Sequence, residues 1–378
     1  MRIGLVTHNV LRGDGQGRVN YELVKALRGA GHEVELVAAH VAPDLMDVGV
    51  TWVPVRHRIN AVDLVRSWDF ARRVDSVWPM IEQRYDVSIA CGFVMRRPHS
   101  INAVHFVHGT WLRSPYHTSR VRRDLRGAYH RVYSTSNARW ELQTFGLART
   151  VVAVSAMVRD ELIEVGVPSE KVRVILNGVD TSEYAPGDFD RATLGLPVGV
   201  PLGLFVGDLR SPIKNLDVVL RALTRTPDVH FAVAGGLRGS PYPAMAAALD
   251  LQDRVHFLDF RRDVADLMRA ADFFALPSRR DSCPLVLLEA LASGLPAIVT
   301  DRVGTADLVA GGAGFVTDDP DDDLRVADAI TQLTTDRDLR ANMSRVARAT
   351  AERHSWADMA AAYEQTILEM APATTGRA

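Results

Sequence analysis

The first 39 residues, MRIGLVTHNVLRGDGQGRVNYELVKALRGAGHEVELVAA (1–39), decide the fold class. Ile3–Thr7 is a short apolar stretch typical of a buried strand, and a loop with three glycines follows at residues 9–17. Residues 19–27 repeat apolar side chains every three or four positions, which predicts a helix, and Val34–Ala38 predicts a second strand. A strand, a helix and a strand in this order form the unit from which parallel sheets are built.

The rest of the chain continues this alternation. Strands are predicted at Val87–Ala90, Ala103–Val107, Val151–Val154, Val172–Leu176, Leu202–Val206, Val229–Ala234, Val255–Phe260, Phe273–Leu276, Ala297–Thr300 and Gly314–Val316. Helices are predicted at about 216–225, 263–271, 284–293 and 323–335. The sequence therefore predicts an α/β protein with two Rossmann-like, doubly wound domains that face each other across a cleft.

A stretch rich in glycine, proline and aspartate, NGVDTSEYAPGDFDRATLGLPVGVP (177–201), predicts the boundary between the two domains. We expect a first domain at 1–178 and a second at 179–355. The last helical pattern, 356–370, has no strand after it, so we expect this helix to return toward the first domain.

Composition excludes several classes of protein. The chain has 378 residues, of which 47% are hydrophobic and 24% are charged, as is ordinary for a globular protein. No apolar run is long enough to span a membrane, and the N-terminus lacks the pattern of a secretory leader. Cys91 and Cys283 are too few for a disulfide framework. We therefore expect a cytoplasmic protein, with or without peripheral contact with the inner face of the membrane.

Charge is distributed unevenly along the chain. Residues 1–178 hold 24 Lys and Arg against 17 Asp and Glu, whereas the remaining residues hold 20 against 29. Five arginines gather between positions 120 and 131: Arg120, Arg122, Arg123, Arg126 and Arg131. Two interpretations stay open, namely a solvated arginine-rich helix, or contact with an anionic lipid surface or anionic acceptor. Nucleic acid is not expected as a partner.

The glycine loop GDGQGR (13–18) lies between a strand and a helix, where free N–H groups and the helix dipole favour a phosphate. Arg18, at its sixth position, departs from the dinucleotide fingerprint, and the Walker ending is absent. The loop is either an anion site formed around Gly15, Gly17 and Arg18 or an ordinary flexible loop.

A second candidate is the stretch FVGDLRSPIKN (205–215), which places Arg210 and Lys214 after the first strand of the second domain. Two cations at the carboxyl end of a strand can neutralise a diphosphate. The alternative is a solvated loop, although lysine occurs at only three positions of the chain.

His108, in HFVHGTW (105–111), is a third candidate, because it follows an apolar strand and precedes a glycine. Strand alternation would send His105 to the opposite face, and a structural role for His108 stays open. DDPDDD (318–323) is expected to cap the next helix rather than bind a metal, and no spacing of ligands predicts a metal site.

The stretch DSCPLVLLEALASGLPAIV (281–299) places Asp281 just before a helix and Glu289 inside it. A helix that begins with Pro284 and ends at Gly294 would separate the two backbones by on the order of 10 Å. This separation suits the two ends of an extended ligand, although two solvated charges beside a buried helix are the alternative.

Together these stretches resemble the retaining, nucleotide-sugar-dependent glycosyltransferases of the two-Rossmann (GT-B) type, glycosyltransferase family 4. The resemblance runs from Met1 to about Met370 and includes VHGTW, VILNGVD, LFVGDLRSPIKN and the Asp281–Glu289 stretch. It implies transfer of a sugar from a nucleoside diphosphate sugar, with UDP preferred over GDP, to a hydroxyl of a glycan, glycolipid or natural product.

The resemblance also implies roles for individual residues. Glu289 would hold the ribose, Lys214 the diphosphate, and the backbone of Phe260 and Arg261 the base. His108 would touch the donor sugar, and Asp281 would lie near its reaction centre. The backbone N–H groups of the Cys283, Pro284 and Leu285 segment and of the Gly15–Gly17 loop would hold sugar and phosphate.

Three departures from the family pattern stand out. Asp281 replaces the usual first glutamate, and Ser282-Cys283-Pro284 replaces the usual Phe-Gly after it. Asp208 follows Gly207 where arginine is usual, so the second cation would come from Arg210.

No cofactor and no obligatory metal are expected, because the donor is the substrate and the protein's cations would face the leaving diphosphate. Two alternatives remain. One is another enzyme on the same fold, such as a nucleotide-sugar epimerase or a phosphorylase, and the other is a nucleotide-sugar-binding protein without catalysis.

Overall fold

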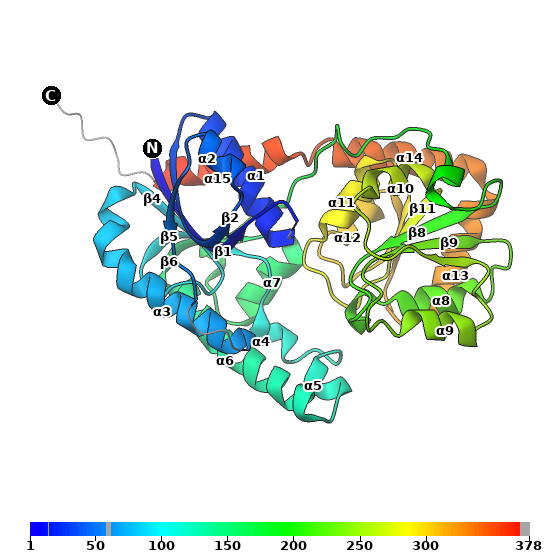
Figure 1. Ribbon diagram of the computed structural model, residues 1–378, viewed down its shortest axis with the longest axis horizontal. Helices are drawn as coiled ribbons and strands as arrows, with labels where there is room; N and C mark the ends of the chain where they lie inside the picture. The colour runs from blue at the N-terminus through cyan, green and yellow to red at the C-terminus, as the bar shows by residue number, and fades with distance from the viewer. Residues whose placement is uncertain (14, 58–61, 371–378) are drawn as a thin grey trace. The chain divides into compact units, whose positions relative to one another are not determined.

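The computed structural model describes residues 1–13, 15–57 and 62–370. The chain divides into two compact units (Figure 1). The first contains residues 1–177 and the last helix, α15 (Trp356–Met370), and the second contains Gly178–Ser355. Each unit holds one parallel sheet with helices packed on it, which confirms the predicted α/β class with two Rossmann-like domains.

The sheet of the first unit has seven parallel strands. In spatial order they are β3 (Thr51–Pro54), β2 (Glu33–Val41), β1 (Arg2–Val10), β4 (Val87–Cys91), β5 (His99–Val104), β6 (Ala148–Ala153) and β7 (Val172–Val174). Strands β1, β2 and β3 follow one another toward one edge of the sheet. The chain then returns to the other side of β1, where β4, β5, β6 and β7 follow one another toward the opposite edge. The carboxyl ends of β1 and β4 are therefore the switch point at which open sheets bind ligands.

Most helices of the first unit lie in the connections between its strands. They are α1 (Gly15–Gly29), α2 (Asp44–Asp47), α3 (Asp63–Ile81), α4 (His108–Trp111), α5 (Thr118–Val121), α6 (Leu125–Leu147), α7 (Ala156–Glu164) and α15, with single turns η1 (Glu82–Arg84) and η2 (Ser169–Lys171). Met359, Tyr363 and Ile367 of α15 are buried at four-residue spacing, and this helix packs against α1.

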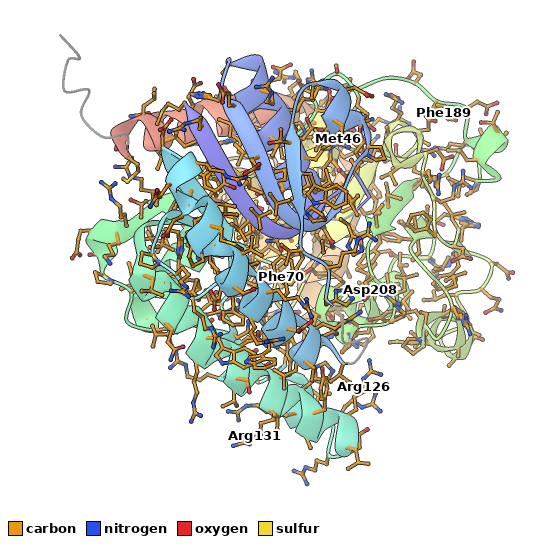
Figure 2. The ribbon with its side chains drawn as sticks, turned by 60° about the vertical axis from the view of Figure 1, so that its left-hand side comes forward. Met46, Phe70, Arg126, Arg131, Phe189 and Asp208 are labelled. Carbon is orange, nitrogen blue, oxygen red and sulfur yellow. The ribbon has the colours of Figure 1, made fainter. Side chains whose placement is uncertain are left out.

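The long helix α3 closes one face of the first sheet. Phe70 (Figure 2), Val74 and Trp78 of this helix are buried against Val6 and Val37 of the central strands. Burial of one such large side chain stabilises the fold by about 1.5–3 kcal/mol. This cluster holds β1 and β2, and therefore the loop that leads into α1.

The sheet of the second unit has six parallel strands. In spatial order they are β10 (Val255–Phe257), β9 (His230–Ala234), β8 (Leu202–Val206), β11 (Phe273–Leu276), β12 (Ala297–Thr300) and β13 (Gly314–Thr317). The same doubly wound order places the switch point between β8 and β11.

Seven helices accompany this second sheet within the part of the chain that the structure describes. They are α8 (Leu216–Leu223), α9 (Tyr242–Ala248), α10 (Val264–Ala270), α11 (Leu285–Ala292), α12 (Ala306–Ala310), α13 (Asp323–Thr335) and α14 (Arg337–Ala351), with single turns η3 (Arg191–Leu194) and η4 (Pro212–Lys214). Leu287, Leu288 and Leu291 make α11 a core helix.

The chain enters and leaves the second unit through two segments that are joined to each other. Val179 and Ser355 form a parallel β-bridge, and the Val179 N–H donates to the carbonyl of His354 at 3.0 Å. Arg348 adds a further link, because its guanidinium donates to the carbonyls of Thr181 and Tyr184, each at 3.0 Å.

Several elements differ from the sequence-based prediction. The expected strand at Ala103–Val107 is β5 instead, which begins at His99 and ends at Val104. Its polar residues obscured it, yet His99 and Asn102 are buried and bonded to each other at 3.1 Å. The sequence reading also missed β3, α3, α6 and α14.

The composition of α6 explains why periodicity did not reveal it. Its buried positions include Ser134, Asn137, Glu141 and Thr144, so it carries no continuous apolar stripe. Among the described residues, no helix is both long and apolar enough to cross a lipid bilayer.

Candidate functional site

Lys214 and Asp281 form an ion pair at the carboxyl end of the second sheet. Lys214 ends η4, in the loop between β8 and α8, and Asp281 lies in the loop between β11 and α11. The Asp281 backbone is fixed because its N–H donates to the Arg302 carbonyl at 3.0 Å and its carbonyl accepts from Gly304 at 2.7 Å. Two residues predicted to meet the donor are therefore in direct contact.

A set of polar residues behind Lys214 holds its loop in place. Asn215 is buried, adopts the left-handed conformation (φ 63°) and donates to the carbonyl of Pro277 at 2.8 Å. The Arg279 guanidinium donates to the Pro212 carbonyl at 2.7 Å and binds both carboxylate oxygens of Asp217. These contacts join the loops after β8 and β11, so they determine where Lys214 points.

The role of Arg279 in holding the Lys214 loop was not predicted from the sequence. Burial would lower the pKa of Arg279, but hydrogen bonds and charge from Asp217 and Asp321 outweigh burial and raise it. Arg279 follows β11 by three residues and Asp217 opens α8. The presence of charged residues soon after a strand was visible in the sequence. The pairing of Arg279 with Asp217 could not be predicted from it.

Arg210, the second expected cation, is held by Asp208. The Arg210 Nε lies 2.9 Å from Asp208 Oδ1, and the Arg210 backbone N–H donates to the same oxygen at 3.1 Å. Burial favours a higher pKa for Asp208, but the hydrogen bonds from Arg210 prevail and hold it below its ordinary value. Asp208, which stands where arginine is usual in the family that the sequence resembles, thus binds Arg210 two positions later.

A cavity of about 480 Å³ opens beside these residues. Its lining includes Gly207, Asp208, Arg210, Gly235 and Phe260. A side chain at Gly235 would place its Cβ 2.0 Å from the carbonyl oxygen of Gly207, so only glycine allows this close approach of the two strand ends. Two of the lining residues therefore offer only backbone to the cavity.

The rim of the cavity carries Phe260, whose side chain is 72% exposed, and Arg261, which is paired with Asp263. Asp259, with φ of 55°, accepts the Leu237 N–H on its side chain at 3.0 Å. This contact fixes the loop after β9 against the loop after β10. Phe260 and Arg261 thus line a cavity, and their contact with a base stays a prediction.

The α11 helix begins one residue later than expected. Pro284 occupies the N-cap and Leu285 is the first helical residue. Cys283 is buried before the cap, and Glu289 lies half-buried just over one turn into the helix. Since Pro284 has no N–H, only its neighbours can offer amide donors here. At the other end, Arg348 donates to the Ala292 carbonyl at 2.8 Å, which links α11 to α14.

In the first unit, Gly15 and Gly17 lie in the first turn of α1 rather than in a loop before it. Arg18 pairs with Glu22 at 2.7 Å, and its guanidinium carbon lies 6.0 Å from the ring centroid of Trp356 in α15. The arginine therefore takes part in contacts within the first unit. Asp14, part of the same motif, lies outside the described residues.

The first turn of α1 is attached to the sheet by a buried polar network. The Asn20 side chain donates to the Thr7 hydroxyl at 3.0 Å and to the Asn9 carbonyl at 3.1 Å. The Cys91 thiol donates to the side-chain oxygen Oδ1 of Asn20 at 3.3 Å, and burial raises the pKa of this thiol to about 12. Cys91 is therefore a protonated structural donor at neutral pH.

His108 begins α4 and is bound by Glu141, a buried residue of α6. Glu141 accepts the His108 backbone N–H at 2.9 Å and lies 2.5 Å from ring Nδ1. The expected position of His108 at a strand end is wrong, because β5 has already ended at Val104. For the same reason, strand alternation does not apply to His105.

Sequence reasoning missed Glu141, since α6 was not recognised. This carboxylate orients the imidazole, and it leaves Nε2 as the ring nitrogen that can meet a ligand. Glu141 is one of only two acidic residues in the mostly basic segment 120–149, the other being Asp124, and this was the available signal in the sequence.

The acidic run at 318–323 caps a helix, as expected. Asp322 accepts the N–H groups of Leu324 at 3.1 Å and Arg325 at 3.0 Å, at the start of α13. In the described part of the chain, no group of three or more His, Cys, Asp or Glu side chains is arranged to hold a metal ion.

The second unit therefore gathers most of the predicted residues around one sheet edge. Lys214 contacts Asp281, and Arg210 shares a cavity with Phe260 and Arg261. His108, Gly15, Gly17 and Arg18 belong to the first unit, where His108 and Arg18 have separate carboxylate partners.

Models of two protein families match the chain in succession. The model described as Glycosyltransferase Family 4 matches residues 13–183, and the one described as Glycosyl transferases group 1 matches residues 187–350. The two matches correspond closely to the two units.

Named relatives share this assignment. The D-inositol 3-phosphate glycosyltransferase of Corynebacterium glutamicum is 30% identical over 313 residues, which cover 77% of this chain and 72% of that protein. The enzyme of the same name from Xylanimonas cellulosilytica is 34% identical over 59% of this chain. The matched segment spans only 57% of that second relative.

Solved structures agree on the fold. The Anabaena protein HepE, solved in complex with UDP-glucose, is 21% identical and superposes with a TM-score of 0.73 over 98% of this chain and 100% of its own. At this identity the likeness concerns the fold alone.

Proposed function

The chain belongs to the GT-B glycosyltransferases of family 4, and on this premise we propose that it is a retaining hexosyltransferase using a nucleoside diphosphate sugar. The observation that carries the proposal is the ion pair of Lys214 and Asp281 near a cavity that Gly207, Gly235 and Phe260 help to line. A cation for phosphate, a carboxylate for sugar hydroxyls and a cavity for a base would meet at one sheet edge.

The second unit is the proposed donor domain. Phe260 and Arg261 would contact the base, Glu289 the ribose, and Lys214 the diphosphate. UDP is the nucleotide that we propose, and it is also the nucleotide in the solved UDP-glucose complex of HepE, a protein of the same fold. The amide groups of Cys283 and Leu285 lie at the N-terminus of α11, where the helix dipole favours negative charge.

The chemistry needs stabilisation of a departing diphosphate. When the bond between the sugar and the phosphate breaks, negative charge develops on the leaving oxygens, and Lys214 and Arg210 would stabilise it. We propose that the acceptor hydroxyl attacks from the face that the diphosphate leaves, which retains the anomeric configuration. No obligatory metal takes part, because the protein supplies the cations.

The first unit is the proposed acceptor domain. Glu141 holds Nδ1 of His108, so Nε2 would face the sugar. The curated relatives are named for D-inositol 3-phosphate, which makes a phosphorylated polyol the first acceptor to test. The N-terminus of α1, with Gly15, Gly17 and Arg18, would also contact the sugar and phosphate of the donor. Glycans, glycolipids and natural products remain further acceptor classes.

The deciding experiment offers purified protein UDP-, GDP- and ADP-sugars with a panel of acceptors, and analyses the products by mass spectrometry. A new glycosidic bond with release of UDP supports the proposal. Interconversion of donor sugars without an acceptor would indicate an epimerase, and nucleotide binding without any product would indicate a binding protein. Activity that chelator abolishes and only manganese or magnesium restores would contradict the metal-free mechanism.

Exposed residues of α5 and α6 favour a second partner, an anionic membrane surface at the inner face of the cytoplasmic membrane. Val121 is 57%, Leu125 91% and Val132 56% exposed. In the sequence they lie among the arginines of residues 120–131, of which Figure 2 labels Arg126 and Arg131. Apolar side chains interspersed with arginines are typical of segments that lie on anionic lipid.

Liposome co-sedimentation tests this contact. We expect binding to vesicles that contain phosphatidylglycerol, weakened by salt and by Leu125→Ser, with little binding to neutral vesicles. Leu368→Ser, at a position 55% exposed on α15, is the matched control. Equal binding of the wild type to neutral vesicles, or none to either kind, would refute the membrane contact.

A further inference from the structure

Both cations proposed for the diphosphate are bound by aspartates of the same sheet edge. Arg210 is bound by Asp208, and Lys214 by Asp281. The positive charge of Lys214 also acts on Asp208. The four side chains thus form a cluster of two cations and two carboxylates, whose formal charge is zero.

Asp208 differs from Asp281 in its position. It follows Gly207 directly after β8 (Figure 2) and lines the cavity of about 480 Å³ that also contains Phe260. Its carboxylate is 44% exposed, whereas that of Asp281 is 14% exposed. Asp208 is therefore the more accessible of the two carboxylates, and it lines the proposed nucleotide cavity, where it binds Arg210 as a phosphate oxygen would.

A nucleotide that enters this cavity approaches the Asp208 carboxylate. Its diphosphate can bind Arg210 only after Asp208 has released that arginine. The released carboxylate then repels the negatively charged phosphate. The repulsion differs between donor and product. The diphosphate of a nucleotide sugar carries two charges, whereas the free product carries nearly one more at neutral pH, because a terminal phosphate loses its second proton near pH 6.

We propose that Asp208 is a positioning residue for product release, which holds Arg210 in the empty site and disfavours the free nucleoside diphosphate more than the nucleotide sugar. This inference rests on the proposed function and concerns the same site. In the donor complex, Arg210 exchanges Asp208 for the phosphate. After transfer, the additional charge on the product increases its repulsion by the Asp208 carboxylate, and Arg210 returns to Asp208 once the product has left.

The test measures UDP affinity by calorimetry for the wild type and Asp208→Asn. An exposed pair of this kind changes affinity by a modest factor, so we expect UDP to bind the variant roughly fivefold more tightly. The Ki of UDP should fall by more than the KM of the UDP-sugar, so product inhibition becomes stronger. Asp266→Asn, which removes another Asp–Arg pair of the same unit, is the matched control and should change neither constant.

A double-mutant cycle with Arg210→Gln distinguishes this role from a general change of charge. The gain from Asp208→Asn should shrink in the Arg210→Gln background, since Arg210 can no longer be released. An undiminished gain would refute the exchange of Arg210, and equal changes in Ki and KM would refute selectivity for the product. If UDP binds the wild type and Asp208→Asn does not bind it more tightly, the inference fails while the proposed function stands. Absence of any nucleoside diphosphate binding would refute both.

Discussion

The ammonium group of Lys214 is bound by the carboxylate of Asp281, 67 positions later in the chain. The two loops that carry them follow β8 and β11, the neighbouring strands at the switch point of the second sheet. Doubly wound topology therefore produces this contact. It also gives Asp281 two possible tasks, to hold Lys214 in the empty enzyme and to contact the sugar in the donor complex.

The first prediction concerns Asp281. We expect Asp281→Asn to leave UDP affinity unchanged or slightly higher, because the amide releases Lys214 for the phosphate, and to lower kcat with the full donor at least tenfold. Calorimetry with UDP and steady-state kinetics provide the two values. Loss of UDP affinity as large as that of Lys214→Ala would show that Asp281 positions the lysine rather than acting on the sugar.

Glu289 should behave in the opposite way. Its carboxylate would accept charge-assisted hydrogen bonds from the ribose, each worth about 1.5–3 kcal/mol, so Glu289→Ala should weaken UDP and donor alike by roughly tenfold or more. Glu183→Ala, a surface change in the same unit, serves as control. If only donor binding suffers, the glutamate contacts the sugar and the two ends of the ligand have been assigned in reverse.

Arg279 is expected to support Lys214 without touching the ligand. Its side chain is 10% exposed and bridges Asp217, which is 19% exposed, and Asp321, which is 46% exposed. Arg279→Ala removes both ion pairs but leaves Asp217 its pair with Arg221, so it should cost about 1–3 kcal/mol of unfolding free energy. UDP affinity, measured below the melting temperature of the variant, should fall to the level of Lys214→Ala. Full UDP affinity in a destabilised variant would confine Arg279 to a structural role.

Glu141 should affect turnover through His108. An amide at this position keeps one acceptor for the His108 backbone but removes the charge opposite Nδ1. We expect Glu141→Gln to reduce kcat about tenfold or more with little change in donor KM. In a His108→Ala background the same change should have a much smaller effect. Additive losses in the double variant would mean that the two residues act independently.

His99 makes stability depend on pH. Burial lowers its pKa from the ordinary 6.5, and its neutral ring bonds the Arg97 carbonyl and the Asn102 amide. Because the unfolded chain binds this proton more readily, stability is complete above pH 6.5 and falls as the pH decreases below it. The melting temperature should decline between pH 7 and pH 5, with a shallower decline in His99→Gln. Parallel slopes for the two proteins would exclude His99 as a cause.

The strands that sequence analysis placed well are those whose side chains are apolar on both faces. Leu202–Val206 and Phe273–Leu276 are short apolar runs, and both are strands with the predicted bounds. His99–Val104 carries buried polar residues that satisfy one another, and α6 buries polar side chains. Their burial depends on partners distant in sequence, so local pattern could not reveal it.

The candidate site shows the same division. Lys214, Asp281 and Glu289 were predicted from short sequence motifs that follow a predicted strand or begin a predicted helix. Such motifs can be recognised from neighbouring residues alone. Glu141 and Arg279 were not predicted, because each binds a residue that is distant in the sequence. Glu141 lies 33 positions from His108, and Arg279 lies 62 positions from Asp217.

The alternation of strands and helices in two successive sets, and the charged residues that follow the strands, were predictable because apolar periodicity and loop composition are local properties of the chain. The pairing of Asp208 with Arg210, of Asp281 with Lys214 and of Glu141 with His108 could be found only in the folded protein. Charges attract whichever opposite charge the packed sheets bring within reach, and sheet order sets that proximity rather than order along the chain.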